Sequence, residues 1–111
     1  MDCIFCKVVN KEIPSSMLYE DDEIVVIKDI EPKAPVHLLI IPKKHIPSLN
    51  QLEPEDKELI GKLVLVGKEM AKNQGVNESG YRLTFNVGKD SGQTINHLHL
   101  HLLGGRKLIF A

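Results

Sequence analysis

Apolar residues at helical spacing mark two helices in the chain. A short N-terminal helix, ending near Asn10 and before Pro14, is predicted by the residues Ile4, Phe5, Val8 and Val9. A long helix begins at residues 53–54, where proline suits the first helical position, and ends near Gly75. Its apolar residues fall at steps of three and four: Leu59, Ile60, Leu63, Val64, Gly67, Met70 and Ala71. This stripe predicts one helix face packed against a sheet.

The other apolar segments predict strands. Residues 17–20 and 23–29 flank the acidic turn Asp21-Asp22, which is typical of a hairpin. Residues 36–41 are nearly all apolar, so we expect this strand to be covered on both faces and to end at Pro42. Residues 81–87 and 97–103 are the last two strands, separated by a loop over 88–96. The predicted fold class is α+β: an antiparallel meander sheet packed with one long helix and a short N-terminal helix.

Length and composition narrow the class of protein. The 111 residues are 42% hydrophobic and 26% charged, which predicts a single globular domain over residues 1–111. Fourteen Lys and Arg against fifteen Asp and Glu leave no broad basic field, so we expect no nucleic-acid partner, whereas a small anionic ligand fits. The apolar runs are too short for a membrane span and no signal segment is visible. We therefore expect a cytoplasmic protein without a membrane partner.

The two cysteines, Cys3 and Cys6, form a Cys-x-x-Cys that fits a metal clip, a redox pair or a disulfide. A thioredoxin-like pair follows a strand, but only two residues precede Cys3. A disulfide over so short a loop would remove little chain entropy, and a reducing compartment disfavours it. A metal is the leading interpretation, provided that further ligands exist.

Residues 93–103 carry the most informative pattern. In a strand, His97, His99 and His101 project from one face, and the leucines at 98, 100 and 102 from the other. Three imidazoles on one face either bind a metal together or include a neutral imidazole that attacks phosphorus. The neighbouring loop 88–94 has two glycines, a lysine and hydroxyl groups, which suit the approach of main-chain amides to phosphate. The loop favours the second interpretation.

The segment His97-Leu98-His99-Leu100-His101-Leu102-Leu103 matches the signature of the histidine triad family. Other segments resemble the Hint branch of that family, which contains nucleoside phosphoramidases and nucleotide hydrolases, and in particular its bacterial-type members with an N-terminal Cys-x-x-Cys. These segments are Asp29-Ile30-x-Pro32-x-Ala34-Pro35-x-His37, Ile41-Pro42-Lys43-Lys44-His45, Asn86-x-Gly88 and Gly104-Gly105-Arg106. The resemblance covers nearly the whole chain and implies the histidine triad fold.

The resemblance implies a reaction. His99 is the nucleophile that attacks the α-phosphorus of a nucleoside 5′-phosphoramidate or a related AMP-X ester, and water then releases the monophosphate from a nucleotidyl-histidine intermediate. Thr94 or a nearby imidazole protonates the leaving group, and His37 supports His99 by its position. The residues expected around the phosphate are Asn86, Gly92, Gln93, Thr94 and His101. Their donors stabilise the charge that grows in the transition state.

The resemblance also implies a nucleoside pocket for a purine. Asp29 accepts both ribose hydroxyls, and the base slot is formed by Ile4, Phe5, Val8, Ile27, Ile30 and Leu39. Three alternatives stay open: a dinucleoside polyphosphate hydrolase of the same family, a metallohydrolase with three histidine ligands, and a nucleotide-binding adaptor.

Some histidine triad proteins carry a Cys₂His₂ site, and this resemblance implies one structural zinc per chain, bound by Cys3, Cys6, His45 and His97. We expect that zinc to lie remote from bond breaking and to stabilise the fold more than it supports turnover. The family also pairs its protomers, which implies a homodimer that buries the long helix and the strand at 81–87.

Overall fold

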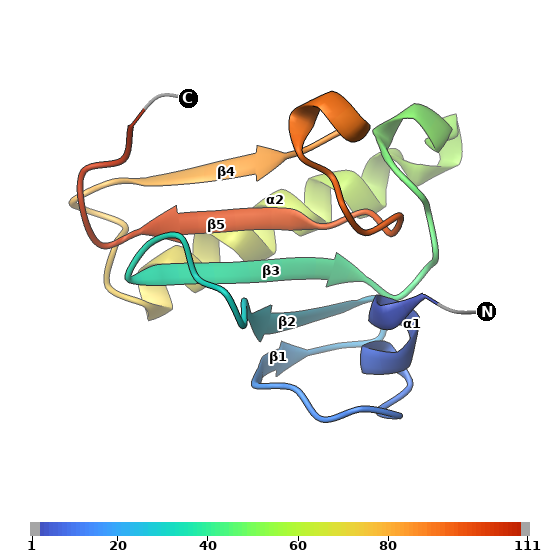
Figure 1. The fold of residues 1–111 in the computed structure, drawn as a ribbon, viewed down its shortest axis with the longest axis horizontal. Coiled ribbons are helices and arrows are strands. Elements are labelled where there is room, and N and C mark those ends of the chain that lie inside the picture. The colour runs from blue at the N-terminus through green and yellow to red at the C-terminus, as the bar shows by residue number, and fades with distance from the viewer. Residues whose placement is uncertain (1–2, 110–111) are drawn as a thin grey trace.

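The computed structural model describes residues 3–109 as a five-stranded antiparallel sheet with helices on both faces (Figure 1). The strand order is β1-β2-β3-β5-β4, and every neighbouring pair is antiparallel. The strands are β1 (Met17–Glu20), β2 (Ile24–Lys28), β3 (Val36–Pro42), β4 (Tyr81–Phe85) and β5 (Leu100–Gly104). The expected α+β fold class is confirmed.

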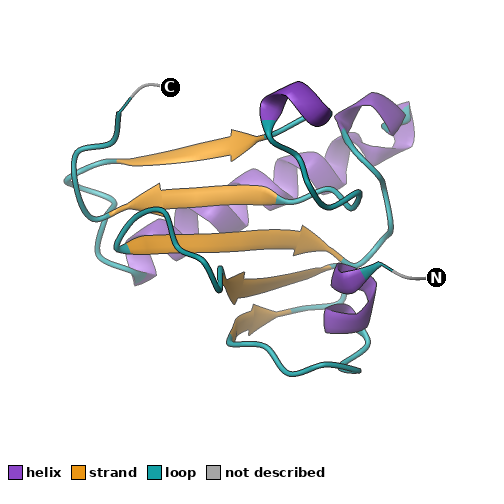
Figure 2. Ribbon diagram, viewed as in Figure 1, coloured by secondary structure: helices purple, strands orange, loops and turns teal. Residues whose placement is uncertain are grey.

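The two helices, α1 (Ile4–Val9) and α2 (Lys57–Asn73), cover opposite faces of the sheet (Figure 2). Successive side chains of β2 and β3 alternate between two cores, as the pleat of a strand requires. Val26 and Ile40 join the core under α2, whereas Val25 and Ile41 join the core under α1. The expectation that the strand from residue 36 is covered on both faces is confirmed. Within residues 3–109, no helix is long and apolar enough to cross a membrane.

Three 3-10 turns complete the elements: η1 (Leu49–Gln51), η2 (Pro54–Asp56) and η3 (Lys89–Ser91). The long helix starts where proline predicted, although its first turn is η2 and regular α-helix begins at Lys57. Glu53 and Asp56 form a capping box, and the buried Asp56 carboxylate also accepts a hydrogen bond from Lys44 Nζ at 2.6 Å. Gly75, at φ 75°, follows the helix in the left-handed conformation that glycine allows.

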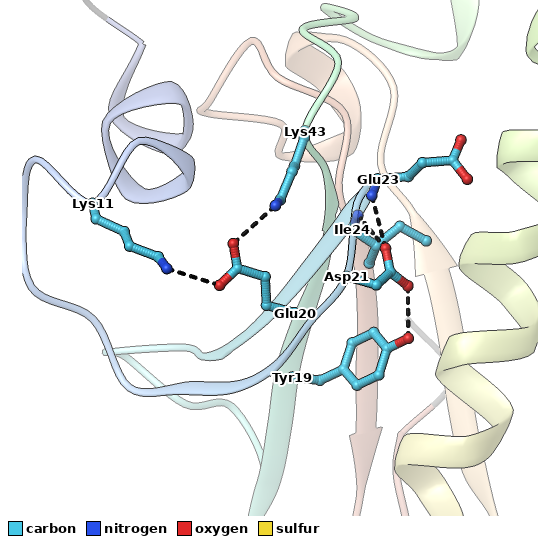
Figure 3. Close-up of polar contacts among 7 residues, drawn as sticks. All are labelled: Lys11, Tyr19, Glu20, Asp21, Glu23, Ile24 and Lys43. Carbon is cyan, nitrogen blue, oxygen red and sulfur yellow. Dashed lines mark hydrogen bonds and ion pairs between the residues drawn. The ribbon is translucent and has the colours of Figure 1, made fainter.

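The hairpin of β1 and β2 is closed by its acidic turn (Figure 3). Asp21 Oδ1 accepts hydrogen bonds from the amides of Glu23 and Ile24 at 2.8 and 2.9 Å, and Tyr19 donates to Oδ2 at 2.6 Å. Burial acts to raise the pKa of Asp21, but these hydrogen bonds outweigh it and lower that pKa to about 2. The carboxylate therefore stays charged and holds the turn.

The last strand begins later than its alternating pattern predicts. β5 starts at Leu100, which pairs with both Ile40 and Phe85, so the expected strand from residue 97 is wrong over its first three residues. The physical reason is competition for main-chain groups. Leu98 donates its amide to the carbonyl of Ile46 at 2.6 Å, and the carbonyl of His97 accepts from the His99 ring, so neither group is free for a sheet ladder. The leucines at 98, 100 and 102 nevertheless all lie in the core under α2, as expected.

Candidate active site and the adjoining metal-ligand cluster

A cavity of about 720 Å³ opens on the face of the sheet that carries α1. It brings together the predicted nucleotide-binding and catalytic residues from five separate segments: Ile4, Phe5, Val8, Ile27, Asp29, Ile30, His37, Leu39, Asn86, Gly92, Thr94, His99 and His101. Gln93 does not line it. The Gln93 amide instead holds the loop, because Nε2 donates to the carbonyls of Pro47 and Ile95 and Oε1 accepts from the Gly88 amide at 2.8 Å.

The sequence interpretation missed two polar lining residues on β4, Arg82 and Thr84. Both were available from the pattern. Side chains two residues apart in a strand share a face. The prediction that Asn86 lies at the phosphate therefore also predicts that the side chains at positions 84 and 82 face the same cavity. Arg82 adds a cation to the cavity wall, and its guanidinium donates to the carbonyl of Ile109 at 2.9 Å.

His99 is oriented as a nucleophile requires. Its ring is buried, and Nδ1 donates to the carbonyl of His97 at 2.7 Å. A neutral imidazole carries one ring proton, so Nε2 keeps a lone pair. Burial lowers the pKa of His99, opposed in part by the hydrogen bond to His97, and the ring is therefore neutral at pH 7.

A chain of hydrogen bonds sets the proton on His101. The amide of Lys33 donates to His37 Nδ1 at 3.0 Å, so neutral His37 carries its proton on Nε2. That Nε2 lies 3.0 Å from His101 Nδ1 and 3.4 Å from Asp29 Oδ2. His101 Nδ1 is then the acceptor, which leaves its Nε2–H as a donor. Burial first, then the neighbouring His99 and His37 rings, lower the pKa of His101 to about 4, so this donor is neutral.

The loop that follows β4 supplies the third side of the cavity. Gly88 and Gly92 take φ values of 82° and 93°, which a residue with a side chain rarely adopts. The hydroxyl of Ser91 donates to the carbonyl of Gly88 at 2.7 Å, whereas Thr94 is exposed at the cavity wall. The loop therefore offers a hydroxyl group to the cavity that His99 and His101 also line.

A second group of side chains converges beside the cavity. The ligand atoms of Cys3, Cys6, His45 and His97 all lie within 4.8 Å of one another, and no disulfide joins the cysteines. His97 Nδ1 lies 3.3 Å from Cys3 Sγ, 3.6 Å from Cys6 Sγ and 3.1 Å from His45 Nδ1. Tetrahedral Zn²⁺ with ordinary bond lengths places its ligands roughly 3.4 Å apart for two nitrogens and roughly 3.6 Å for nitrogen and sulfur. The spacing therefore fits zinc.

Ring protonation separates this cluster from a second one. His97 Nε2 donates to the carbonyl of Pro42 at 2.8 Å, which leaves the Nδ1 lone pair facing the thiols, as a metal ligand requires. Asp29, His37 and His101 also gather three ligand atoms within 4.8 Å. However, the Lys33 amide requires a lone pair on His37 Nδ1, so Nε2 keeps its proton and does not suit a metal. The donor set fits one zinc at the cysteine cluster.

The geometry also bears on the open alternative of a three-histidine metal site. His97 Nδ1 faces the thiols, and His99 Nδ1 donates its proton to the His97 carbonyl. Among the residues that the structure describes, no group of close ligand atoms contains all three rings. Their arrangement does not support a metallohydrolase built on His97, His99 and His101.

Comparisons with known proteins agree with this fold. The family model described as "Scavenger mRNA decapping enzyme C-term binding" matches residues 2–108. An uncharacterized HIT-like protein of Synechocystis is 50% identical over 95% of this chain and 91% of its own length. A purine nucleoside phosphoramidase of Escherichia coli K12 is 42% identical over 96% of this chain and 90% of its own length.

Solved structures give the same result. A HIT family hydrolase of Legionella pneumophila superposes with a TM-score of 0.96 at 47% identity, covering 98% of this chain and 97% of its own. A zinc-bound histidine triad family protein of Mycobacterium smegmatis gives 0.81 at 31% identity, covering 96% and 76%. The five-stranded antiparallel sheet, with buried imidazoles beside a cluster of cysteines and histidines, defines a class of small α+β proteins. Within that class, the chain belongs to the histidine triad family.

Proposed function

We propose that the protein is a nucleotide hydrolase that acts at the α-phosphorus of purine nucleoside 5′-phosphoramidates or related AMP-X substrates. The observation that carries this proposal is the 2.7 Å hydrogen bond from His99 Nδ1 to the His97 carbonyl, which leaves the Nε2 lone pair of a cavity-lining ring as nucleophile. The name of the Escherichia coli relative, a purine nucleoside phosphoramidase, supports the substrate class.

The reaction has two steps. In the first, His99 Nε2 forms a bond to phosphorus as the bond from phosphorus to the leaving nitrogen or oxygen breaks, and Thr94 or a neighbouring imidazole gives the leaving group a proton. The His101 Nε2–H donates to a phosphate oxygen and stabilises its growing charge. In the second step, water attacks phosphorus and gives a proton to the group that protonated the leaving group, the P–N bond to His99 breaks, and the nucleoside monophosphate leaves.

The rest of the cavity suits a nucleoside. Asp29 Oδ1 accepts the amide of Glu31 at 2.8 Å, and the remaining lone pairs of this carboxylate are available for two ribose hydroxyls. Apolar side chains of α1 and of the sheet form a slot for the base, and Ile30, 92% exposed at the cavity wall, is an apolar residue that a bound nucleoside would cover. A purine buries apolar area there on binding.

Two further features belong to this proposal. One structural Zn²⁺ per chain is held by Cys3, Cys6, His45 and His97; it ties the N-terminal segment to the end of β3 and to the residues before β5. Elemental analysis after purification without chelator tests the zinc, and a protein with far less than one zinc per chain would contradict the site.

The protein works as a homodimer: β4 is an edge of the described sheet, and Leu65 of α2 is 62% exposed.

The decisive experiment compares wild type with His99→Ala on adenosine 5′-phosphoramidate and on a diadenosine polyphosphate. We expect wild type to prefer the phosphoramidate, and His99→Ala to lose turnover while it still binds AMP by calorimetry, because a covalent nucleophile acts mainly in the chemical step. Rapid quench should trap a phosphorus adduct on His99. Equal slow hydrolysis by both proteins would indicate an adaptor, and preference for the polyphosphate would indicate the other hydrolase class.

A further inference from the structure

Helix α1 touches both the metal-ligand cluster and the predicted nucleophile. Cys3 is its N-cap residue, with Sγ accepting the amide of Cys6 at 3.3 Å. Between the two cysteines, the buried Phe5 ring packs edge-on against His99, with ring centroids 5.0 Å apart, and against His97 at 5.9 Å. The first turn of α1 therefore carries thiols on one side and the ring that contacts His99 on the other.

His97 provides a second, independent link. Its Nδ1 faces the two thiols, and its main-chain carbonyl accepts the Nδ1 proton of His99 at 2.7 Å. The position of His97 thus decides where its carbonyl lies, and this carbonyl is the acceptor that fixes the His99 tautomer. The sequence interpretation expected the zinc to be remote from the reacting residues. In the structure, His97 belongs to the metal-ligand cluster through its ring and contacts His99 through its carbonyl.

The metal-ligand cluster also supports a helix that would not be stable in isolation. α1 has six residues, well below the roughly 12–15 at which an isolated helix becomes marginally stable. Two things hold it in place. Phe5 and Val8 pack on the sheet, and Cys3 and Cys6 lie within ligand distance of His45 and His97, where the proposed zinc would bind. The same helix lends Ile4 and Val8 to the cavity wall.

We propose that the Cys3, Cys6, His45 and His97 cluster is a positioning site for the reaction: Zn²⁺ bound there holds Phe5 and the His97 carbonyl against His99, and its loss misplaces the nucleophile. This inference rests on the proposed function. Nucleophilic attack is sensitive to displacements of about 1 Å, which can cost up to a hundredfold in rate. Zinc occupancy then sets the turnover rate in addition to the stability of the fold.

The test compares zinc-loaded, chelator-treated and zinc-reconstituted wild type. The readouts are the melting temperature, kcat and KM for adenosine 5′-phosphoramidate, and the ¹⁵N chemical shifts of the His99 ring, which report its tautomer without any turnover. We expect zinc removal to lower kcat by roughly tenfold, beyond any change in KM, and to move the His99 shifts away from a single Nδ1–H form. Reconstitution should restore both.

Two variants keep the test informative if the chelated protein unfolds. Phe5→Leu in the zinc-loaded state removes the ring contact with His99 and should lower kcat several-fold and shift the His99 signals, with zinc content retained. Val9→Ala, on the same helix, loses packing in the same core at a position that does not line the cavity, and should keep wild-type kcat and shifts. Equal kcat losses in the two variants, or none in Phe5→Leu, would overturn the proposal.

The outcomes also separate this inference from the proposed function. If zinc-loaded wild type hydrolyses no phosphoramidate, the proposed function fails, while the His99 shifts still report whether zinc positions the ring. If hydrolysis is normal but zinc removal lowers only the melting temperature, leaving kcat within twofold and the shifts unchanged, the positioning role is wrong and the hydrolase stands.

Discussion

Acid should destabilise the fold through His101, and the structure gives the size of the effect. The ring lies between His99 and His37, at centroid distances of 4.9 and 5.2 Å, and its pKa falls to about 4. In the unfolded chain the same imidazole titrates near ~6.5. Between these values the unfolded chain binds more protons than the folded one, so the free energy of unfolding falls as the pH falls. The contribution is complete above pH ~6.5 and is lost progressively toward pH ~4.

The magnitude follows from these two pKa values. At pH ~5 the ring is about 97% protonated in the unfolded chain and about 10% in the folded one, which corresponds to a loss of about 2 kcal/mol. Burial also lowers the pKa values of His37 and His99, so these rings add to the loss with the same sign. For a domain stable by roughly 5–15 kcal/mol, the effect is large enough to measure.

Urea unfolding followed by circular dichroism measures it directly. Wild type and His101→Gln are unfolded at pH ~7 and at pH ~5 in the same metal buffer, and we expect the variant to lose about 2 kcal/mol less stability between the two pH values. Losses that agree within about 0.5 kcal/mol would refute the reasoning. An NMR titration that places the pKa of His101 above ~6 would refute it as well.

Three further predictions test other parts of the structure. Gly67→Val should destabilise the protein by about 1–3 kcal/mol in urea unfolding, because even a Cβ there lies 3.0 Å from Leu83 Cδ2; an unchanged midpoint would show that the helix can move away. Asp56→Asn should lower the melting temperature with kcat and KM unchanged, since the carboxylate accepts from Lys44 and from the Glu53 amide at the helix cap and does not line the cavity. Light scattering should give about twice 12.5 kDa; a 12.5 kDa species at micromolar concentration would contradict the dimer.

Periodicity was sufficient to predict the elements that are decided by burial. The two-sided strand β3, the leucines at 98, 100 and 102 and most of the α2 stripe lie as predicted, because each depends on which face meets the core. The prediction was wrong for Val64, which is 41% exposed, whereas Val66 packs against the core. The start of β5 could not be predicted this way. An extended segment alternates its side chains whether or not its amides pair with a strand, and here a loop carbonyl at Ile46 and the His99 ring take those groups.

The candidate site shows the same division. Residue types and the family signature pointed to His99, His101 and Asp29, and the cavity brings them together. Their proton positions could not be predicted, since these depend on where a main-chain amide or carbonyl lies in space. The contact of Phe5 with His99 also required the fold, because the two residues are 94 positions apart along the chain.

The ring protons of three histidines are assigned by main-chain groups. The amide of Lys33 acts on His37, the carbonyl of His97 on His99, and the carbonyl of Pro42 on His97. Every amino acid supplies a carbonyl and every residue except proline supplies an amide, so most substitutions at positions 33 and 42 leave these protons in place. Proline is harmless at 42, where only its carbonyl is used, but at 33 it would delete the donor to His37. The protonation pattern therefore depends on the conformation of the backbone, and most substitutions of the neighbouring side chains leave it unchanged.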